Sequence, residues 1–115
     1  MIISHEEFEL PKEFAEQWIK ALRSGEYAQC DSVLYSGETD QYCCLGVACR
    51  IVNVDTVILN QVELPYMLGT HVPKALPEAL HGHGHMLSEY LAGLNDDGAT
   101  FEEIADWIEK HVKFV

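Results

Sequence analysis

Apolar residues recur at helical spacing near the start of the chain. Between residues 11 and 24 they lie one, three and four positions apart and share one helical face: Phe14, Ala15, Trp18, Ile19 and Leu22. Charged and polar residues fill the opposite face. Pro11 suits the first helical position, and Gly25 follows where a left-handed C-terminal cap belongs. The pattern therefore predicts an amphipathic helix over residues 11–24.

The segment 42–52 is apolar on every side except at Arg50. Such a run is typical of either a buried helix or a central strand. Its length, and the helical spacing of Leu45, Ala48 and Val52, favour a buried helix over residues 43–52. Gly46 within that helix costs about 1 kcal/mol relative to alanine. We therefore expect another backbone to approach closely at Gly46.

Helical spacing returns in two later segments, 86–94 and 101–113, and Thr100 with Glu103 fits a capping box before the second. Valine, isoleucine and leucine around Asn60-Gln61 predict a small hairpin over residues 56–64. The expected fold class is α-rich α+β, with about four helices around the buried central helix and a two- or three-stranded antiparallel sheet. The expected core contains these apolar residues: Trp18, Leu22, Leu45, Ala48, Leu91, Ile104 and Ile108.

The 115 residues are the length of one domain, so we expect a single globular domain over residues 1–115.

The net charge limits the classes of partner that such a domain can bind. Seven Lys+Arg against nineteen Asp+Glu give a formal net charge of −12, which disfavours direct binding to nucleic acid or to an anionic membrane. The chain has no signal-peptide pattern and no apolar run near the about 20 residues of a membrane span. We expect a soluble, cytoplasmic protein.

The four cysteines form no Cys-x-x-Cys pair and no spread framework, so we expect reduced thiols rather than disulfides. Cys43 and Cys44 stand at the start of the expected central helix, where the helix N-terminus can lower a thiol pKa. With a histidine such as His71, either thiol gives a cysteine-hydrolase arrangement. The alternative is that the thiols serve as small apolar core groups.

Three histidines alternate with glycines at His81, His83 and His85. In an extended segment this spacing puts all three imidazoles on one side, as ligation of zinc or another transition metal requires. No acid or cysteine stands beside them at a familiar metal spacing, so we expect a solvated loop and no metal, with metal ligation as the alternative.

Asn95 and Asp96 begin an Asn-Asp-Asp-Gly sequence. An EF-hand with its glycine at Gly98 places Gly93 at the first ligand position, and glycine has no side chain to ligate calcium. A tight turn between helices is the better interpretation. Asn95 and Asp96 can still direct polar groups into a pocket.

Two segments carry a resemblance. Residues 41–49 (QYCCLGVAC) resemble the YCCLGVLC stretch, and residues 94–105 (LNDDGATFEEIA) the LNDxGxSFxEIA stretch, of small uncharacterised proteins encoded by bacteriophages and some bacteria. The Trp18 helix and the SGEY sequence at 24–27 are similar too, whereas residues 56–85 match poorly. The resemblance implies a bacterial cytoplasm and a phage origin, and it implies no established activity.

The two motifs suggest a shared site. One motif starts a helix and the other ends one, so their meeting would give a concave ligand-binding site. Tyr42 would stack, Cys44 would form a wall, and Asn95 with Asp96 would supply hydrogen bonds. The alternative is that Asn95 and Asp96 only close a turn while Cys44 fills the core.

The function expected is non-enzymatic binding by an accessory protein. It would inhibit a host protein with a basic surface, such as a defence protein, or sequester a small nucleotide-like ligand. The −12 charge favours the protein partner, because an anionic ligand needs a local cation such as Arg23, Arg50 or Lys74. A cysteine hydrolase is the alternative, and a structural phage component is a third reading. We expect no cofactor, and a homodimer remains open.

Overall fold

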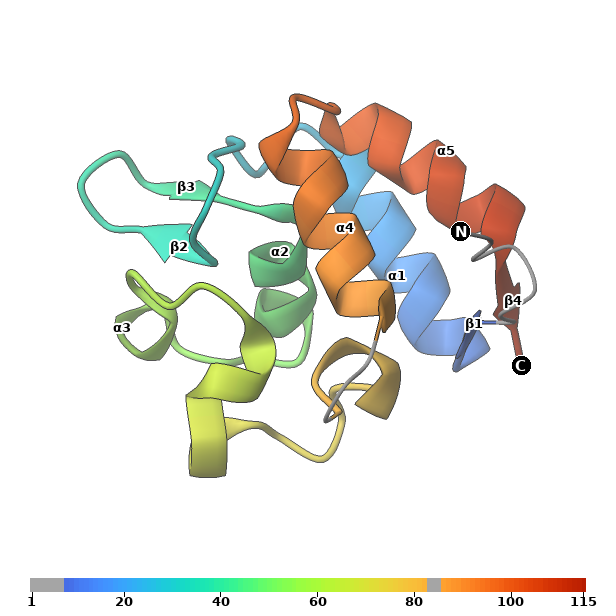
Figure 1. Cartoon of the computed structure of the whole chain (residues 1–115), viewed down its shortest axis with the longest axis horizontal. Coiled ribbons are helices and arrows are strands. Elements are labelled where there is room, and N and C mark those ends of the chain that lie inside the picture. The colour runs from blue at the N-terminus through green and yellow to red at the C-terminus, as the bar shows by residue number, and fades with distance from the viewer. Residues whose placement is uncertain (1–7, 83–85) are drawn as a thin grey trace.

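The computed structural model describes residues 8–82 and 86–115 of the chain, and it shows a helix-rich α+β fold (Figure 1). The helices are α1 (Lys12–Arg23), α2 (Cys44–Ile51), α3 (Thr56–Leu59), α4 (Met86–Asp96) and α5 (Phe101–His111), with 3-10 turns η1 (Pro65–His71) and η2 (Glu78–Leu80). The strands are β1 (Phe8–Leu10), β2 (Tyr35–Ser36), β3 (Gln41–Tyr42) and β4 (Val112–Phe114). No helix in the described ranges is both long enough and apolar enough to cross a membrane.

The core forms where α2 packs against α1 and α4, and α1 against α5. All of α2 from Cys44 to Cys49 is buried, so the prediction of a buried central helix is confirmed. Leu22 is 3% exposed, and the other six predicted core residues are 0% exposed. The capping box of Thr100 and Glu103 is present at the start of α5. The 3.6-residue period thus located the main helices and their inner faces.

Gly46 shows why the central helix tolerates a glycine. A Cβ atom built there would lie 1.8 Å from the carbonyl oxygen of Leu34, far inside van der Waals contact. The loop that carries Leu34 also accepts a hydrogen bond from the Cys43 N–H at 3.3 Å. The expected close approach of a second backbone is therefore confirmed, and it anchors this loop across the start of α2.

The hairpin expected over residues 56–64 is wrong. Asp55 caps a short helix there, because its Oδ1 accepts a hydrogen bond from the Val57 N–H at 3.0 Å. α3 ends at Leu59, and Gln61 turns the chain with a φ of 65°. The antiparallel pair is instead β2 with β3, in the register Tyr35 to Tyr42. A side-chain cap outweighed the β-branched composition that favoured strands.

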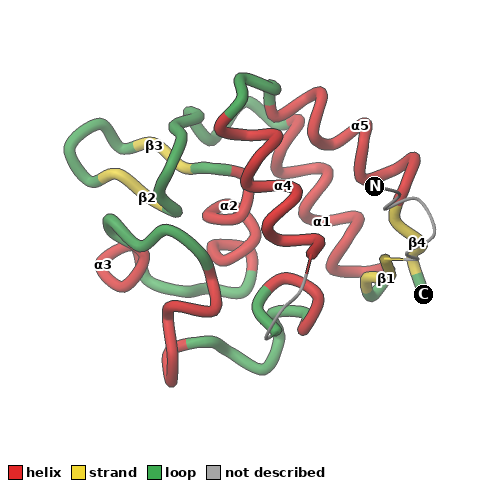
Figure 2. Tube along the Cα trace, in the orientation of Figure 1, coloured by secondary structure: helices red, strands yellow, loops and turns green. Residues whose placement is uncertain are grey.

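A second pair of strands joins the two ends of the described chain. β1 and β4 pair in parallel, with Phe8 opposite Val112, at the far side of the molecule from β2 and β3 (Figure 2). The helix expected to reach residue 113 therefore ends at His111, because the next residues form β4. The expected antiparallel sheet is thus present as β2 with β3, and the parallel pair of β1 with β4 is an addition that the sequence did not predict.

Candidate functional site

The two motifs meet at a buried hydrogen bond. Asn95, 3% exposed near the end of α4, accepts a hydrogen bond through Oδ1 from the backbone N–H of Cys44 at 3.1 Å. The N-cap residue Cys43 provides no side-chain cap, so Asn95 satisfies a donor that the first turn of α2 leaves open. The end of α4 therefore lies against the start of α2, as the two motifs led us to expect.

The rest of the Asn95 amide is also used inside the protein. Its Oδ1 accepts a second bond from Gln29 Nε2 at 2.9 Å, and its Nδ2 donates to the Cys30 carbonyl at 2.8 Å. Gln29 in turn donates to the Ala99 carbonyl at 2.8 Å and accepts from the Phe101 N–H at 3.1 Å. This hydrogen-bond network joins the loop after α1 to the starts of α2 and α5, so Asn95 acts as a structural residue here.

Asp96 and Cys44 have separate roles in this region. Asp96 is exposed and accepts a hydrogen bond from the Ser32 N–H at 2.9 Å, where the backbone has a φ of 72°. Cys44 is 0% exposed and has no surface to offer a ligand. A shallow hollow of about 230 Å³ lies beside this hydrogen-bond network and is lined by Gln29, Cys30, Asp31, Asn95, Gly98 and Ala99. Neither Tyr42 nor Cys44 contributes to its lining, so the expected four-residue concave site does not form as a unit.

Tyr42 belongs to a cluster of three tyrosines. Its ring centroid lies 5.1 Å from that of Tyr27, edge to face, and 4.7 Å from that of Tyr35. Tyr35 donates its hydroxyl hydrogen to Asp40 at 2.9 Å. Burial raises the pKa of Tyr42 above its ordinary value. The Tyr42 ring already packs against two neighbours, and its role as a stacking platform for a ligand stays a prediction.

The thiols are poorly suited to act as nucleophiles. All four cysteines are free, and burial raises the pKa of Cys43 to about 12 and that of Cys44 well above its ordinary value. Desolvation outweighs the lowering that a helix N-terminus can give, which favours the alternative in which these thiols serve as small apolar core groups. The Cys44 thiol faces the Leu91 carbonyl at 3.7 Å. His71 is exposed at the end of η1, and among the described residues no hydrogen bond joins it to a thiol.

The histidine run is described only in part. His81 Nε2 donates to the Leu76 carbonyl at 3.1 Å, while His83 and His85 lie outside the described residues. Within the ranges 8–82 and 86–115, no group of three or more histidine, cysteine or acidic side chains is placed to hold a metal ion. Whether the three histidines together ligate a metal stays a prediction.

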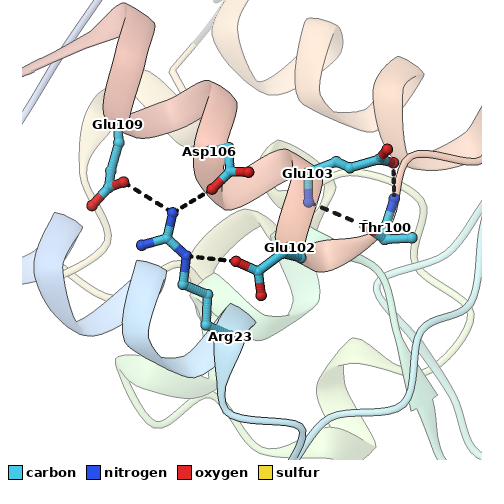
Figure 3. A network of polar contacts seen from close by, with 6 residues as sticks. All are labelled: Arg23, Thr100, Glu102, Glu103, Asp106 and Glu109. Carbon is cyan, nitrogen blue, oxygen red and sulfur yellow. Dashed lines mark hydrogen bonds and ion pairs between the residues drawn. The ribbon is translucent and has the colours of Figure 1, made fainter.

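One flank of α5 carries a row of carboxylates. Arg23 of α1 forms ion pairs with Glu102 at 3.1 Å, with Glu109 at 2.9 Å and with Asp106 (Figure 3). These carboxylates remain 63%, 52% and 64% exposed, whereas Arg23 is 29% exposed. Hydrogen bonds to the carboxylates raise the pKa of Arg23, and the guanidinium lowers the pKa of Glu109. The sequence spacing of four and three placed these acids on one flank, yet no sequence signal pointed to Arg23 as their partner.

The other flank of α5 carries an aromatic stack. Trp107 lies between Tyr90 of α4, at a centroid distance of 4.9 Å, and His111, at 4.7 Å with nearly parallel rings. Tyr90 and Trp107 are half-buried and His111 is exposed. We define the α5 outer face as the surface residues of this helix: Glu102, Glu103, Asp106, Trp107, Glu109, Lys110 and His111. It combines an acidic edge beside α1 with an aromatic edge beside α4.

Comparison with known proteins gives one family. Residues 10–61 are similar to a family described as a domain of unknown function (DUF8296), a match that covers just under half of the chain. It includes α1, α2 and α3, and it ends before Asn95 and the α5 outer face. No curated protein and no solved structure matches the chain.

Proposed function

We propose that this protein is a non-enzymatic binding protein that docks onto a basic surface of another protein and inhibits it. The observation that carries the proposal is the acidic edge of the α5 outer face, where Glu102, Asp106 and Glu109 are each more than half exposed. Three carboxylates and one guanidinium leave this edge with two net negative charges. A formal net charge of −12 on the whole chain adds to its field.

The acidic edge is free to exchange partners. Exposed ion pairs of this kind contribute about 0–1 kcal/mol each, because water and salt screen them. A lysine or arginine from another protein can therefore pair with Glu102, Asp106 or Glu109 at little cost to the fold. The negative field of the chain would also steer a basic surface toward this helix and raise the association rate.

The aromatic edge adds contact area next to these charges. Tryptophan and tyrosine are enriched among the residues that dominate binding energies at protein interfaces. Trp107 and Tyr90 are both half-buried, and their stack with His111 fixes the ring positions before binding. A partner that covers both edges gains charge complementarity and aromatic contact together.

The resemblance of residues 41–49 and 94–105 to bacteriophage-encoded proteins supports a bacterial host protein as the target. A defence protein with an exposed basic patch is the partner class that we propose. The competing function, a cysteine hydrolase using Cys43 or Cys44 with His71, is disfavoured by the burial of both thiols.

The test compares capture by three forms of the protein from a bacterial host lysate, with identification by mass spectrometry. The first is the unchanged protein and the second carries Glu102→Gln, Asp106→Asn and Glu109→Gln. The third, a matched control, neutralises three other exposed acids through Glu16→Gln, Glu38→Gln and Glu63→Gln.

We expect the unchanged protein and the control to retain the same basic protein and to inhibit its purified activity. The second form should lose both properties. Equal capture by all three forms, or equal loss in both variants, would contradict a role for the α5 outer face.

A further inference from the structure

An open cleft of about 500 Å³ lies in the segment that runs from η1 through η2. Its polar lining comes from Tyr66, Lys74, Glu78 and His81, and apolar residues such as Val72 and Leu76 form the rest. This size falls in the range of about 300–1,000 Å³ that is typical of small-molecule sites. No residue of the α5 outer face lines the cleft, so it is a separate site from the proposed protein interface.

The cleft presents two opposite charges that have no partner among the described residues. Within the described part of the chain, neither the Lys74 ammonium nor the Glu78 carboxylate forms an ion pair or hydrogen bond, although both side chains line the same cavity. The other cations considered from the sequence are engaged: Arg23 by three carboxylates, and Arg50 by the Val54 carbonyl at 2.7 Å. Lys74 and Glu78 are therefore available to a ligand with complementary charges.

The remaining lining suits an apolar body. Tyr66 is 52% exposed and lies at the cleft, where its ring can cover an apolar or aromatic group. Leu76 is 1% exposed and closes the cleft toward the core. His81 donates from Nε2 to the Leu76 carbonyl at 3.1 Å, so its ring is fixed to the backbone at one wall. Because the His81 ring is already held, ordering it costs little entropy when a ligand binds.

We propose that this cleft binds a small apolar zwitterion: an α-amino acid with an aromatic or aliphatic side chain, or a dipeptide of that kind. Its carboxylate pairs with Lys74, its ammonium with Glu78, and its side chain packs between Tyr66 and Leu76. A zwitterion has no net charge, so the field of a −12 chain does not repel it. A nucleotide fits less well, because its phosphate charge meets one lysine in an acidic protein.

The test titrates L-phenylalanine and glycyl-L-phenylalanine into the full chain and follows binding by calorimetry and by backbone NMR shifts. Two further probes each remove one charge: phenylalanine amide lacks the carboxylate, and N-acetylphenylalanine lacks the ammonium. Adenosine monophosphate tests the nucleotide class. We expect one or both zwitterions to bind and to shift the signals of Tyr66, Lys74 and His81. The one-charge probes should bind at least fivefold more weakly.

Variants locate the binding. Lys74→Gln and Glu78→Gln should each weaken binding at least fivefold, whereas Lys20→Gln and Glu63→Gln change the same charges elsewhere and should leave it unchanged. Tyr66→Ala should weaken binding, and its exposed neighbour Met67, which does not line the cleft, should tolerate alanine. Circular dichroism checks that each variant folds. Tighter binding of adenosine monophosphate, no binding of either zwitterion, or binding indifferent to Lys74 and Glu78 would overturn the proposal.

Discussion

The side-chain oxygen of Asn95 accepts a hydrogen bond from the backbone N–H of Cys44, 51 positions earlier in the chain, at 3.1 Å. Both residues are buried. The bond makes a residue of α4 the cap of α2, and the same amide holds Gln29 and the Cys30 carbonyl. The two motifs that resemble phage proteins are thus joined physically, and the joint is structural.

Replacing Asn95 with alanine should destabilise the protein by about 3 kcal/mol or more, because each buried polar group left without a partner costs about 1–3 kcal/mol. The Cys44 N–H and the Cys30 carbonyl would lose their partner together. Asn95→Asp should also destabilise, since a carboxylate cannot donate to the Cys30 carbonyl. Urea denaturation measures both, with the exposed Asp97→Asn as control. Surface substitutions usually change the free energy of unfolding by no more than about 0.5 kcal/mol. A change within that range for Asn95→Ala would show that the Asn95 hydrogen-bond network is dispensable for stability.

Two glycines in helices should respond in opposite ways to alanine. At Gly46 the added Cβ would meet the Leu34 carbonyl oxygen at 1.8 Å, so Gly46→Ala should prevent folding or displace the loop that carries Leu34. At Gly93 in α4 nothing lies within 4 Å of the added Cβ, so Gly93→Ala should stabilise the protein by about 0.5–1 kcal/mol. Thermal denaturation of the two variants decides the matter. Equal melting temperatures would mean that Leu34 does not press on α2.

The cysteines should label slowly and in a fixed order. Cys30 is the one thiol with partial exposure among the four, yet burial and the charges of Asp31 and Asp96 raise its pKa. We expect iodoacetamide at pH 7 to modify Cys30 first, and to reach Cys43, Cys44 and Cys49 only after unfolding in urea. Mass spectrometry after proteolysis assigns the sites. Rapid modification of Cys43 or Cys44 in the folded protein would revive the cysteine-hydrolase alternative.

Stability should fall at high pH because of the same buried thiols. The folded-state pKa values of Cys43 and Cys49 are raised from the ordinary 9.0 to about 12, so folding favours the neutral thiols. Their contribution is fully present below pH 9 and is lost as the pH rises from about 9 toward 12. Each thiol contributes a slope of about 1.4 kcal/mol per pH unit in that window. Urea denaturation at several pH values should therefore give a smaller slope for Cys49→Ala than for the unchanged protein, and identical slopes would argue against burial of the neutral thiol.

The sequence predicted the parts of the fold that depend on local periodicity. The helical stripe containing Trp18, the capping box of Thr100 and Glu103, and the close approach at Gly46 all follow from spacing or from residue type. The pairing of β1 with β4 could not be predicted in this way, because its partners lie near opposite ends of the chain and a three-residue strand leaves little pattern. The short helix α3 was missed since one capping side chain, Asp55, outweighed the composition.

The candidate sites were less predictable because they depend on tertiary contacts. The side-chain amide of Gln29 is central to the hydrogen-bond network, because it bonds to both Asn95 and the Phe101 N–H. No local sequence pattern identifies Gln29 as such a residue. The thiol pKa of Cys44 depended on two opposing effects, and the depth of burial that decides between them is a tertiary property. The cleft at Lys74 and Glu78 lies in the stretch that matched the phage-type motifs poorly, so only the fold brings its residues together.

Binding of a basic protein to the α5 outer face, as we propose, can be measured through the dissociation constant of the captured partner. It should be measured at low and at physiological salt for the unchanged protein, for the variant with Glu102, Asp106 and Glu109 neutralised, and for the control with Glu16, Glu38 and Glu63 neutralised. We predict that the first variant binds at least tenfold more weakly, that the control stays within twofold, and that the difference shrinks as salt screens the charges. Equal dissociation constants for the two variants would contradict the claim.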